Sequence, residues 1–182
     1  MAANLVYFDL ETQRSAQEVG GWRNIPKMGL AIASTYNTRE GAYRIYTEQE
    51  VNDLIQELRR ADCVIGFNIV HFDYAVLAPY SLFDFSQVPT LDLMLSIEKT
   101  LGYRISLDSV AEASLGINKT ADGMESLRWW KQGKVREVAE YCCYDVKTTR
   151  LVHEFGVQEG KVYYVDSRSK LKREIPVQWN IA

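Results

Sequence analysis

Two acidic residues interrupt the first apolar segment of the chain, VYFDLETQ at residues 6–13. Side chains alternate between the two faces of a strand, so Asp9 and Glu11 share one face while Phe8 and Leu10 share the other. Paired acids on one face fit either the solvent face of an edge strand or a central strand that serves a site. This segment alone leaves both interpretations open, so the choice depends on the other acids of the chain.

The composition is that of an ordinary globular protein, with 47% hydrophobic and 25% charged residues in a chain of 182. Such a chain is long enough for one domain with a full hydrophobic core. No apolar run approaches the ~18 residues that span a bilayer, and no signal peptide precedes the first strand. We therefore expect an intracellular, cytoplasmic protein that does not bind membranes, with the nucleoid or nucleus also open. Three cysteines, two of them adjacent, fit core positions in a reducing compartment.

The net charge of −3 argues mildly against holding nucleic acid by bulk electrostatics. The charge is unevenly distributed, because residues 161–182 carry five basic residues and two acids, a net +3, which leaves −6 on residues 1–160. The pattern predicts a basic hairpin around Asp166 to Lys170, within the same domain as residues 1–160. This hairpin can contact nucleic acid or dock another protein.

The order of the secondary structure patterns indicates the fold class. Strand patterns over residues 5–10, 28–36 and 42–46 predict an antiparallel meander, with a loop and a short helical piece between the first two. Strands and helices then alternate. Helices are expected over 48–60, in 71–80 up to Pro79, in 89–102 after a strand end, over 109–116 with Ser106 or Asp108 as cap, and over 134–157, while 63–68 forms a buried strand. This order predicts a mixed α/β sheet with helices on its faces.

Three segments place acids where the core pattern should continue. The first holds Asp9 and Glu11, and the second holds Asp73, which follows a buried strand and opens a helix. In the third, Tyr141 and Asp145 are four residues apart and therefore share one helix face. Each also has a structural explanation: the helix dipole favours an acid at the position of Asp73, and Asp145 can be a solvated helix residue.

Read together and in this order, FDLET, NIVHFD and YCCYD resemble the three motifs of the DEDD superfamily of 3′-to-5′ exonucleases. The second and third are most similar to the proofreading exonuclease of family B DNA polymerases and to stand-alone relatives. The resemblance spans Asp9 to Asp145 and implies a ribonuclease H-like fold. It also implies a catalytic, metal-binding set of four acids: Asp9, Glu11, Asp73 and Asp145. Tyr141, four residues before the last acid, resembles the tyrosine subtype.

The chemistry supports grouping these acids. Two carboxylates about 4 Å apart repel by roughly 4 kcal/mol near a protein surface, so a cluster of four needs compensating cations. Oxygen ligands suit Mg²⁺ or Mn²⁺, and two such ions about 3.5–4 Å apart stabilise the attacking and leaving oxygens of a phosphodiester. With a reference pKa near ~10, the catalytic Tyr141 is expected to position the water first and to transfer protons second.

Substrate contacts follow from the residues around these motifs. Asn68 can hydrogen-bond the terminal nucleotide and Phe72 can stack on its base, although buried structural roles fit both equally well. The resemblance implies that Leu10 and Thr12 touch the terminal sugar. Asp92 is either a support for the acids or a loop acid. His71 lies inside the second motif, where a catalytic role is open but helix-end packing explains it equally well, and His153 is expected to be structural.

Aromatic and basic residues alternate before the first helix and before the third motif. They are Trp22 and Arg23, then Trp129, Trp130, Lys131, Lys134 and Arg136. This combination suits single-stranded nucleic acid, and buried tryptophans with solvated basic residues explain it equally well.

The leading hypothesis is a 3′-to-5′ exonuclease that uses two Mg²⁺ or Mn²⁺ ions on single-stranded DNA or RNA ends. Two alternatives stay open: a catalytically silent module that binds nucleic acid or protein, and an endonuclease of the same fold. A helicase, polymerase or other protein partner fits each of them.

Overall fold

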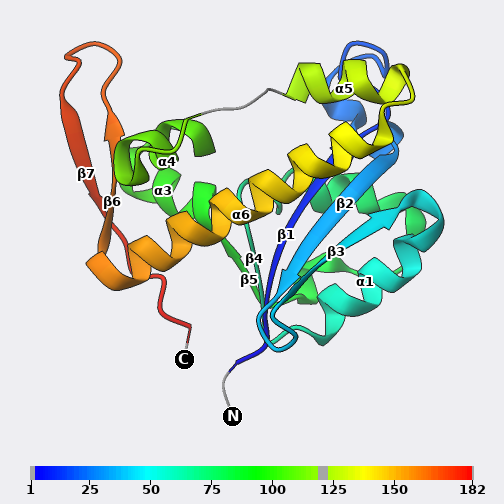
Figure 1. Cartoon of the computed structure of the whole chain (residues 1–182), viewed down its shortest axis with the longest axis horizontal. Helices are drawn as coiled ribbons and strands as arrows, with labels where there is room; N and C mark the ends of the chain where they lie inside the picture. Colours follow the sequence, from blue (N-terminus) through cyan, green and yellow to red (C-terminus); the bar gives the residue numbers. More distant parts are fainter. Residues whose placement is uncertain (1–2, 119–122, 182) are drawn as a thin grey trace.

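The computed structural model describes residues 3–118 and 123–181 (Figure 1). Its centre is a five-stranded sheet in the order β3-β2-β1-β4-β5. The strands are β1 (Leu5–Thr12), β2 (Leu30–Asn37), β3 (Ala42–Thr47), β4 (Cys63–Gly66) and β5 (Thr90–Asp92). β1 pairs antiparallel with β2 and parallel with β4, which confirms the expected mixed sheet. Because β1 is the middle strand, the edge-strand explanation of its two acids is wrong.

Helices cover both faces of this sheet (Figure 1). They are α1 (Val51–Arg60), α2 (Asp73–Leu77), α3 (Leu93–Leu101), α4 (Leu107–Leu115), α5 (Gly123–Lys131) and α6 (Val135–Glu159). Short 3₁₀ turns are η1 (Trp22–Lys27), η2 (Glu48–Glu50), η3 (Ala78–Tyr80) and η4 (Phe85–Gln87). In the described residues, no helix has the length and apolar character needed to cross a membrane.

The two faces of β1 belong to different cores. Val6, Phe8 and Leu10 pack into one cluster with α1 and α2, whereas Tyr7 packs into a second cluster with α3, α4 and α6. α6 crosses the sheet and contacts β1 and β2 (Figure 1). Because Asp9 and Glu11 share the face of Tyr7, their side chains lie on the side covered by α6.

Several boundaries differ from the expectation. β1 continues two residues beyond Leu10, because antiparallel pairing with β2 extends to Thr12. Pro79 lies inside the 3₁₀ turn η3 instead of ending a helix, and Ser106, not Asp108, caps α4 by accepting from the backbone N–H of Ser109. α5 lies between residues 116 and 134, where the sequence predicted no element.

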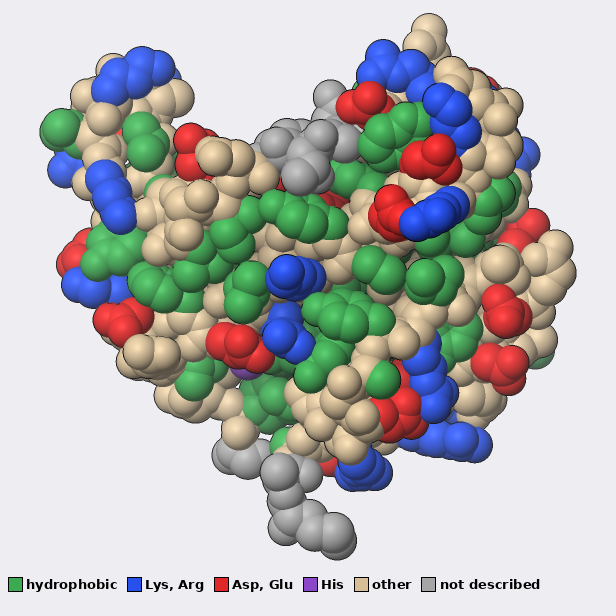
Figure 2. Space-filling view, viewed as in Figure 1, with side chains coloured by type: hydrophobic (Ala, Val, Ile, Leu, Met, Phe, Trp, Pro, Cys, Tyr) green, Lys and Arg blue, Asp and Glu red, His purple; other side chains and the backbone are tan. Residues whose placement is uncertain are grey.

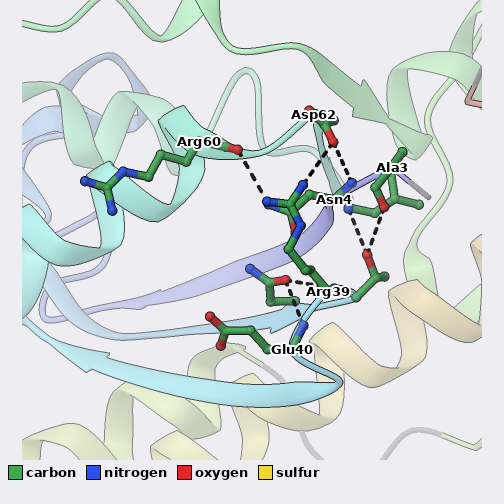
Figure 3. Close-up of polar contacts among 9 residues, drawn as sticks. Ala3, Asn4, Arg39, Glu40, Arg60 and Asp62 are labelled. Atoms are coloured by element: carbon green, nitrogen blue, oxygen red, sulfur yellow. Dashed lines mark hydrogen bonds and ion pairs between the residues drawn. The ribbon is translucent and has the colours of Figure 1, made fainter. Parts of the chain in front are cut away.

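Polar contacts close the amino-terminal edge of the sheet (Figure 3). The backbone N–H of Asn4 donates to Asp62 Oδ2 at 2.7 Å, and Arg39 pairs with the same carboxylate at 3.7 Å. The Asn4 side-chain amide donates to the Arg60 carbonyl at 3.5 Å. These contacts fix the start of β1 and leave its other end, which carries Asp9 and Glu11, for the site.

The C-terminal residues form the predicted hairpin, β6 (Lys161–Val165) and β7 (Lys172–Pro176), as a separate two-stranded sheet. Its inward residues Val162, Tyr164 and Ile175 join the core of α3, α4 and α6. His153 is buried there, with one ring nitrogen 2.9 Å from the Tyr7 hydroxyl and the other 3.2 Å from the Trp179 carbonyl. His153 therefore has the structural role that we expected.

Candidate metal centre and substrate cavity

Three of the four expected acids lie together. Asp9 and Glu11 come from β1 and Asp145 from α6, and their carboxylate oxygens lie within 4.8 Å of one another. β1 presents its two acids on one face, and the crossing of α6 over that face brings Asp145 to them. Long-range packing thus builds the cluster.

Asp73 approaches β1 from the helix α2. Its side chain is 2% exposed, and its Oδ1 accepts the backbone N–H of Leu10 at 3.0 Å. Leu10 separates Asp9 from Glu11, so the fourth acid lies against the strand segment that carries the other two. Asp73 lines the same cavity as Asp9 and Glu11, although it is not one of the three carboxylates grouped within 4.8 Å.

Burial and mutual repulsion raise the pKa values of these acids. For Asp9 the pKa lies well above its usual range, because of burial first and then the charges of Asp73, Asp145 and Glu11. Burial raises the pKa of Glu11 to about 8, although a hydrogen bond from Ser126 acts in the opposite direction. Burial also raises the pKa of Asp73 to about 8 against the effect of the Leu10 N–H. A divalent cation would relieve this repulsion, so the oxygen-only cluster fits Mg²⁺ or Mn²⁺.

Tyr141 lies one helical turn before Asp145 and hydrogen-bonds to its carboxylate. Burial, followed by the charges of Asp145, Glu11 and Asp9, holds the pKa of Tyr141 well above its ordinary value. The ring packs edge-on against Trp129, with 6.3 Å between centroids. The hydroxyl therefore stays protonated and faces the acids as a hydrogen-bond donor.

A cavity of about 720 Å³ opens beside the acids. All four residues expected to touch substrate line it, namely Leu10, Thr12, Asn68 and Phe72. Trp22, which is 70% exposed, also lines the cavity and packs edge-on against Phe72, with 6.3 Å between ring centroids. An apolar and aromatic pocket next to a carboxylate cluster suits a nucleobase beside its phosphate.

Comparison with known protein families shows which superfamily has this arrangement. Residues 6–156 match the RNase H superfamily, a span that contains all three acid segments. The chain belongs to the RNase H superfamily. No curated protein matches the chain. Membership in this superfamily supports a nuclease-type hydrolase that binds nucleic acid and uses a divalent metal at the acid cluster. The matched span ends before the C-terminal hairpin.

In this RNase H superfamily member, Asp92 organises the loop that carries Asn68. Its carboxylate accepts the backbone N–H groups of Asn68 at 2.8 Å and Val70 at 3.0 Å, and it caps α3. Asn68 adopts a left-handed conformation with φ of 68°, and its Oδ1 is buried without a hydrogen-bond partner in the described part of the chain. The loop is thus held in a costly shape, and it keeps a buried, unpartnered polar atom on a residue that lines the cavity.

Two supporting residues escaped the sequence analysis. Ser126, buried on α5, hydrogen-bonds Glu11, and the irregular segment around it gave no signal of that contact. Cys142 lies inside the third motif, where its thiol donates to the Asp9 carbonyl at 3.3 Å and approaches Asp9 Oδ2 at 3.6 Å. His71 is exposed, so the structure gives it no role among the acids.

The tryptophans expected near nucleic acid divide into two groups. Trp129 and Trp130 are half-buried and pack against the cluster of Ile32, Val138 and Cys142. These two tryptophans therefore follow the alternative in which they belong to the core. Trp22 remains exposed at the cavity. Of the nearby basic residues, Lys131 pairs with Glu18 at 2.6 Å and Arg136 with Glu140 at 2.8 Å.

Proposed function

We propose that this protein is a metal-dependent 3′-to-5′ exonuclease of the tyrosine DEDD type, acting on single-stranded ends of DNA or RNA. The observation that supports it best is the grouping of Asp9, Glu11 and Asp145 within 4.8 Å, with Tyr141 one turn away on α6. The adjoining cavity has the size and the aromatic lining for one terminal nucleotide.

Asp9, Glu11, Asp73 and Asp145 would hold two Mg²⁺ or Mn²⁺ ions. When bound, these ions lower the pKa of water and neutralise charge on the phosphodiester during in-line displacement. Asp73 would present one carboxylate oxygen, because the Leu10 N–H already occupies its Oδ1 at 3.0 Å.

The protein's own groups would orient the reactants. The Tyr141 hydroxyl donates its proton to the Asp145 carboxylate, so its oxygen would accept a hydrogen bond from the water and hold that water opposite the leaving oxygen. Phe72 would stack on the terminal base, a contact worth about 1–3 kcal/mol, and Asn68 Oδ1 would accept a hydrogen bond from it. The backbone around Leu10 and Thr12 would meet the sugar. Through these contacts the terminal nucleotide is held in a single position for in-line attack.

The central test is hydrolysis of a 5′-end-labelled oligonucleotide with Mn²⁺ by the intact chain and by Asp9→Asn and Asp145→Asn. Loss of activity by at least about 10³-fold in both variants, each of which still unfolds in a cooperative thermal transition, is the expected result. Asp84→Asn is the matched control, since Tyr80 and Asp84 repeat the spacing of Tyr141 and Asp145 on the surface. Full activity in both acid variants would contradict the proposal.

The same assay separates the alternatives. Stepwise shortening from the 3′ end supports an exonuclease, whereas immediate mid-chain products indicate an endonuclease. Absence of hydrolysis together with no calorimetric Mn²⁺ binding indicates a silent binding module. Matched DNA and RNA strands then show which polymer the site accepts through its contacts to the 2′-hydroxyl.

A further inference from the structure

We propose that the C-terminal hairpin, β6 and β7, together with the cavity at its side, forms a second binding surface for a nucleic acid single strand. It would hold the strand several nucleotides away from the terminal nucleotide at the acids. This inference rests on the proposed function for the identity of the strand as a substrate. The hairpin lies outside the matched span of residues 6–156, so family membership does not assign it a role.

Both acidic side chains of the hairpin form contacts within the hairpin itself. The Asp166 carboxylate accepts the backbone N–H groups of Arg168 at 3.1 Å and Ser169 at 2.6 Å, which shapes the turn. Glu174 pairs with Lys161 at 2.8 Å. Among residues 3–118 and 123–181, no salt bridge engages four remaining cations of the hairpin, which are Arg168, Lys170, Lys172 and Arg173. Their charge is therefore available to an anionic ligand.

A cavity of about 570 Å³ lies between the hairpin and the loop that leads into α4. Its polar and aromatic lining includes Tyr103, Arg104, Ser106, Tyr164, Asp166 and Arg168. Because Arg104 is paired with Glu98 at 3.1 Å, the positive charge that this cavity offers comes from Arg168. Tyr103 is 46% exposed, and its hydroxyl donates to that of Tyr164 at 2.8 Å. An exposed ring for stacking and donors for phosphate are the two elements of single-strand binding.

The hairpin is fixed relative to the acid cluster. α6 carries Asp145 and runs on to Glu159, a distance of about 21 Å at 1.5 Å per residue, and β6 follows directly. Ser114 of α4 ties β6 in place, since its Oγ accepts the Tyr163 N–H at 2.8 Å and donates to the Tyr163 carbonyl at 3.3 Å. The five residues of β6 add about 17 Å from there to the turn. A strand of 20 nucleotides is longer than this path, so one ligand can reach both places.

The surface charge agrees with a strand that passes between the hairpin and α5. Figure 2 shows the outline of the molecule hollowed between these two projections, with lysine and arginine side chains on both. A polyanion would find unpaired positive charge on the hairpin and divalent cations at the acids, whereas Lys131 of α5 is already paired with Glu18 at 2.6 Å. An acidic protein would match the hairpin charge alone, but it would have no use for a nucleoside-sized cavity next to it. These features favour nucleic acid as the occupant.

Binding of fluorescent single-stranded 20-mers, measured by anisotropy in EDTA to prevent hydrolysis, tests the surface. The variant Arg168→Gln/Lys170→Gln removes two exposed charges from the turn, and Arg39→Gln/Arg60→Gln removes two from the opposite, amino-terminal edge of the sheet (Figure 3). The hairpin variant is expected to bind about tenfold more weakly at 50 mM salt, with a log–log salt slope shallower by about 1.4. The control variant should bind like the unchanged protein.

Catalysis gives a second readout with Mn²⁺. For a 20-mer, the hairpin variant should show a KM raised about tenfold with kcat unchanged, and hydrolysis of a dinucleotide, too short to reach the hairpin, should be unaffected. Equal weakening by the control variant would overturn the proposal, as would unchanged 20-mer binding by the hairpin variant. If the unchanged protein binds the 20-mer through the hairpin but hydrolyses nothing, the proposed exonuclease fails while this surface stands.

Discussion

Glu11 and Asp73 carry the clearest electrostatic signature of the site, because burial raises the pKa of each to about 8. In the unfolded chain both titrate near ~4, so the metal-free folded state binds more protons between these values. The free energy of unfolding in EDTA should therefore fall by a few kcal/mol between pH 5.5 and 8.5. Urea denaturation at the two pH values measures this change.

The double variant Glu11→Gln/Asp73→Asn is the control for this pH dependence. Its neutral amides remove both titrating groups at little change in volume, so its stability in EDTA should vary much less with pH and exceed that of the unchanged chain at pH 8.5. If the free energy of unfolding of the unchanged chain instead rises from pH 5.5 to 8.5, folding does not raise the pKa values of these two carboxyls.

Tyr141 differs from a general base in a way that mutation can show. Because its pKa lies well above the ordinary value, the hydroxyl donates a hydrogen bond at every working pH. Tyr141→Phe should lower kcat about 10- to 100-fold without adding or removing a limb of the pH–rate profile. Tyr144→Phe, three residues further along α6, loses only a bond to the Asn118 carbonyl and should retain kcat within about twofold. A kcat of Tyr141→Phe equal to that of the unchanged chain would exclude the positioning role.

At the scale of elements, one carboxylate joins β5, α3 and the loop before α2. Asp92 caps α3 through the N–H groups of Met94 and Leu95 and holds those of Asn68 and Val70. Asp92→Ala should lower the free energy of unfolding by about 2–4 kcal/mol, since a cap is lost and buried N–H groups lose their acceptor.

Activity should fall with Asp92→Ala even where the variant is fully folded, because Asn68 and Phe72 share the loosened loop. Asp84→Ala is the matched control: Asp84 caps η4 by accepting from Ser86, but it is exposed, so the cost should be about 0.5 kcal/mol. Chemical denaturation and kcat/KM at 20 °C measure both effects. A loss no larger than that of Asp84→Ala would show that Asp92 does not hold the loop.

Local sequence signals predicted most of these elements. Alternation gave β1 its two faces, helical spacing gave α1 and α6, and a cap at Ser106 or Asp108 marked the start of α4. The motif residues Asp9 and Asp145 were predictable as partners only through a resemblance, because no local pattern records that α6 crosses β1. The structure adds a contact that residue spacing could not predict: the Asp73 carboxylate accepts a hydrogen bond from the Leu10 N–H.

α5 shows why the remainder could not be predicted. Its sequence, GMESLRWWK, begins with a glycine, and its nine residues are fewer than the ~11–18 over which helical periodicity is recognised. Tertiary contacts hold it instead: Ser126 hydrogen-bonds Glu11, and Trp129 packs on Tyr141. A helix stabilised by its partners leaves little trace in its own sequence.

At the scale of the whole molecule, the hairpin shares its core with the rest of the chain. Val162, Tyr164 and Ile175 lie in one cluster with Leu93 of α3 and Val146 of α6. Gly156 allows the close approach of Trp179, whose ring a Cβ at that position would meet. We therefore propose that residues 161–182 fold together with residues 1–160 as one domain, with the hairpin as a fixed part of its surface.

Metal binding should stabilise this whole unit. A ligand that binds only the folded state adds about 2.7 kcal/mol at a hundredfold excess over its Kd. For a chain of this size, that energy raises the Tm by about 5–10 °C. Scanning calorimetry at pH 7.5 should show this rise on addition of Mn²⁺ or Mg²⁺.

Two variants assign the rise in Tm to the acid cluster. Asp9→Asn/Asp145→Asn removes two of the three carboxylates that lie within 4.8 Å of one another, and its Tm should not respond to Mn²⁺. Without the metal it should melt above the unchanged chain, since neutral amides remove the repulsion among buried acids. The hairpin variant Arg168→Gln/Lys170→Gln keeps all four acids and should show the full rise. An equal rise in the acid variant would place the ions elsewhere, and no rise in the unchanged chain would mean that the cluster stays protonated instead of binding metal.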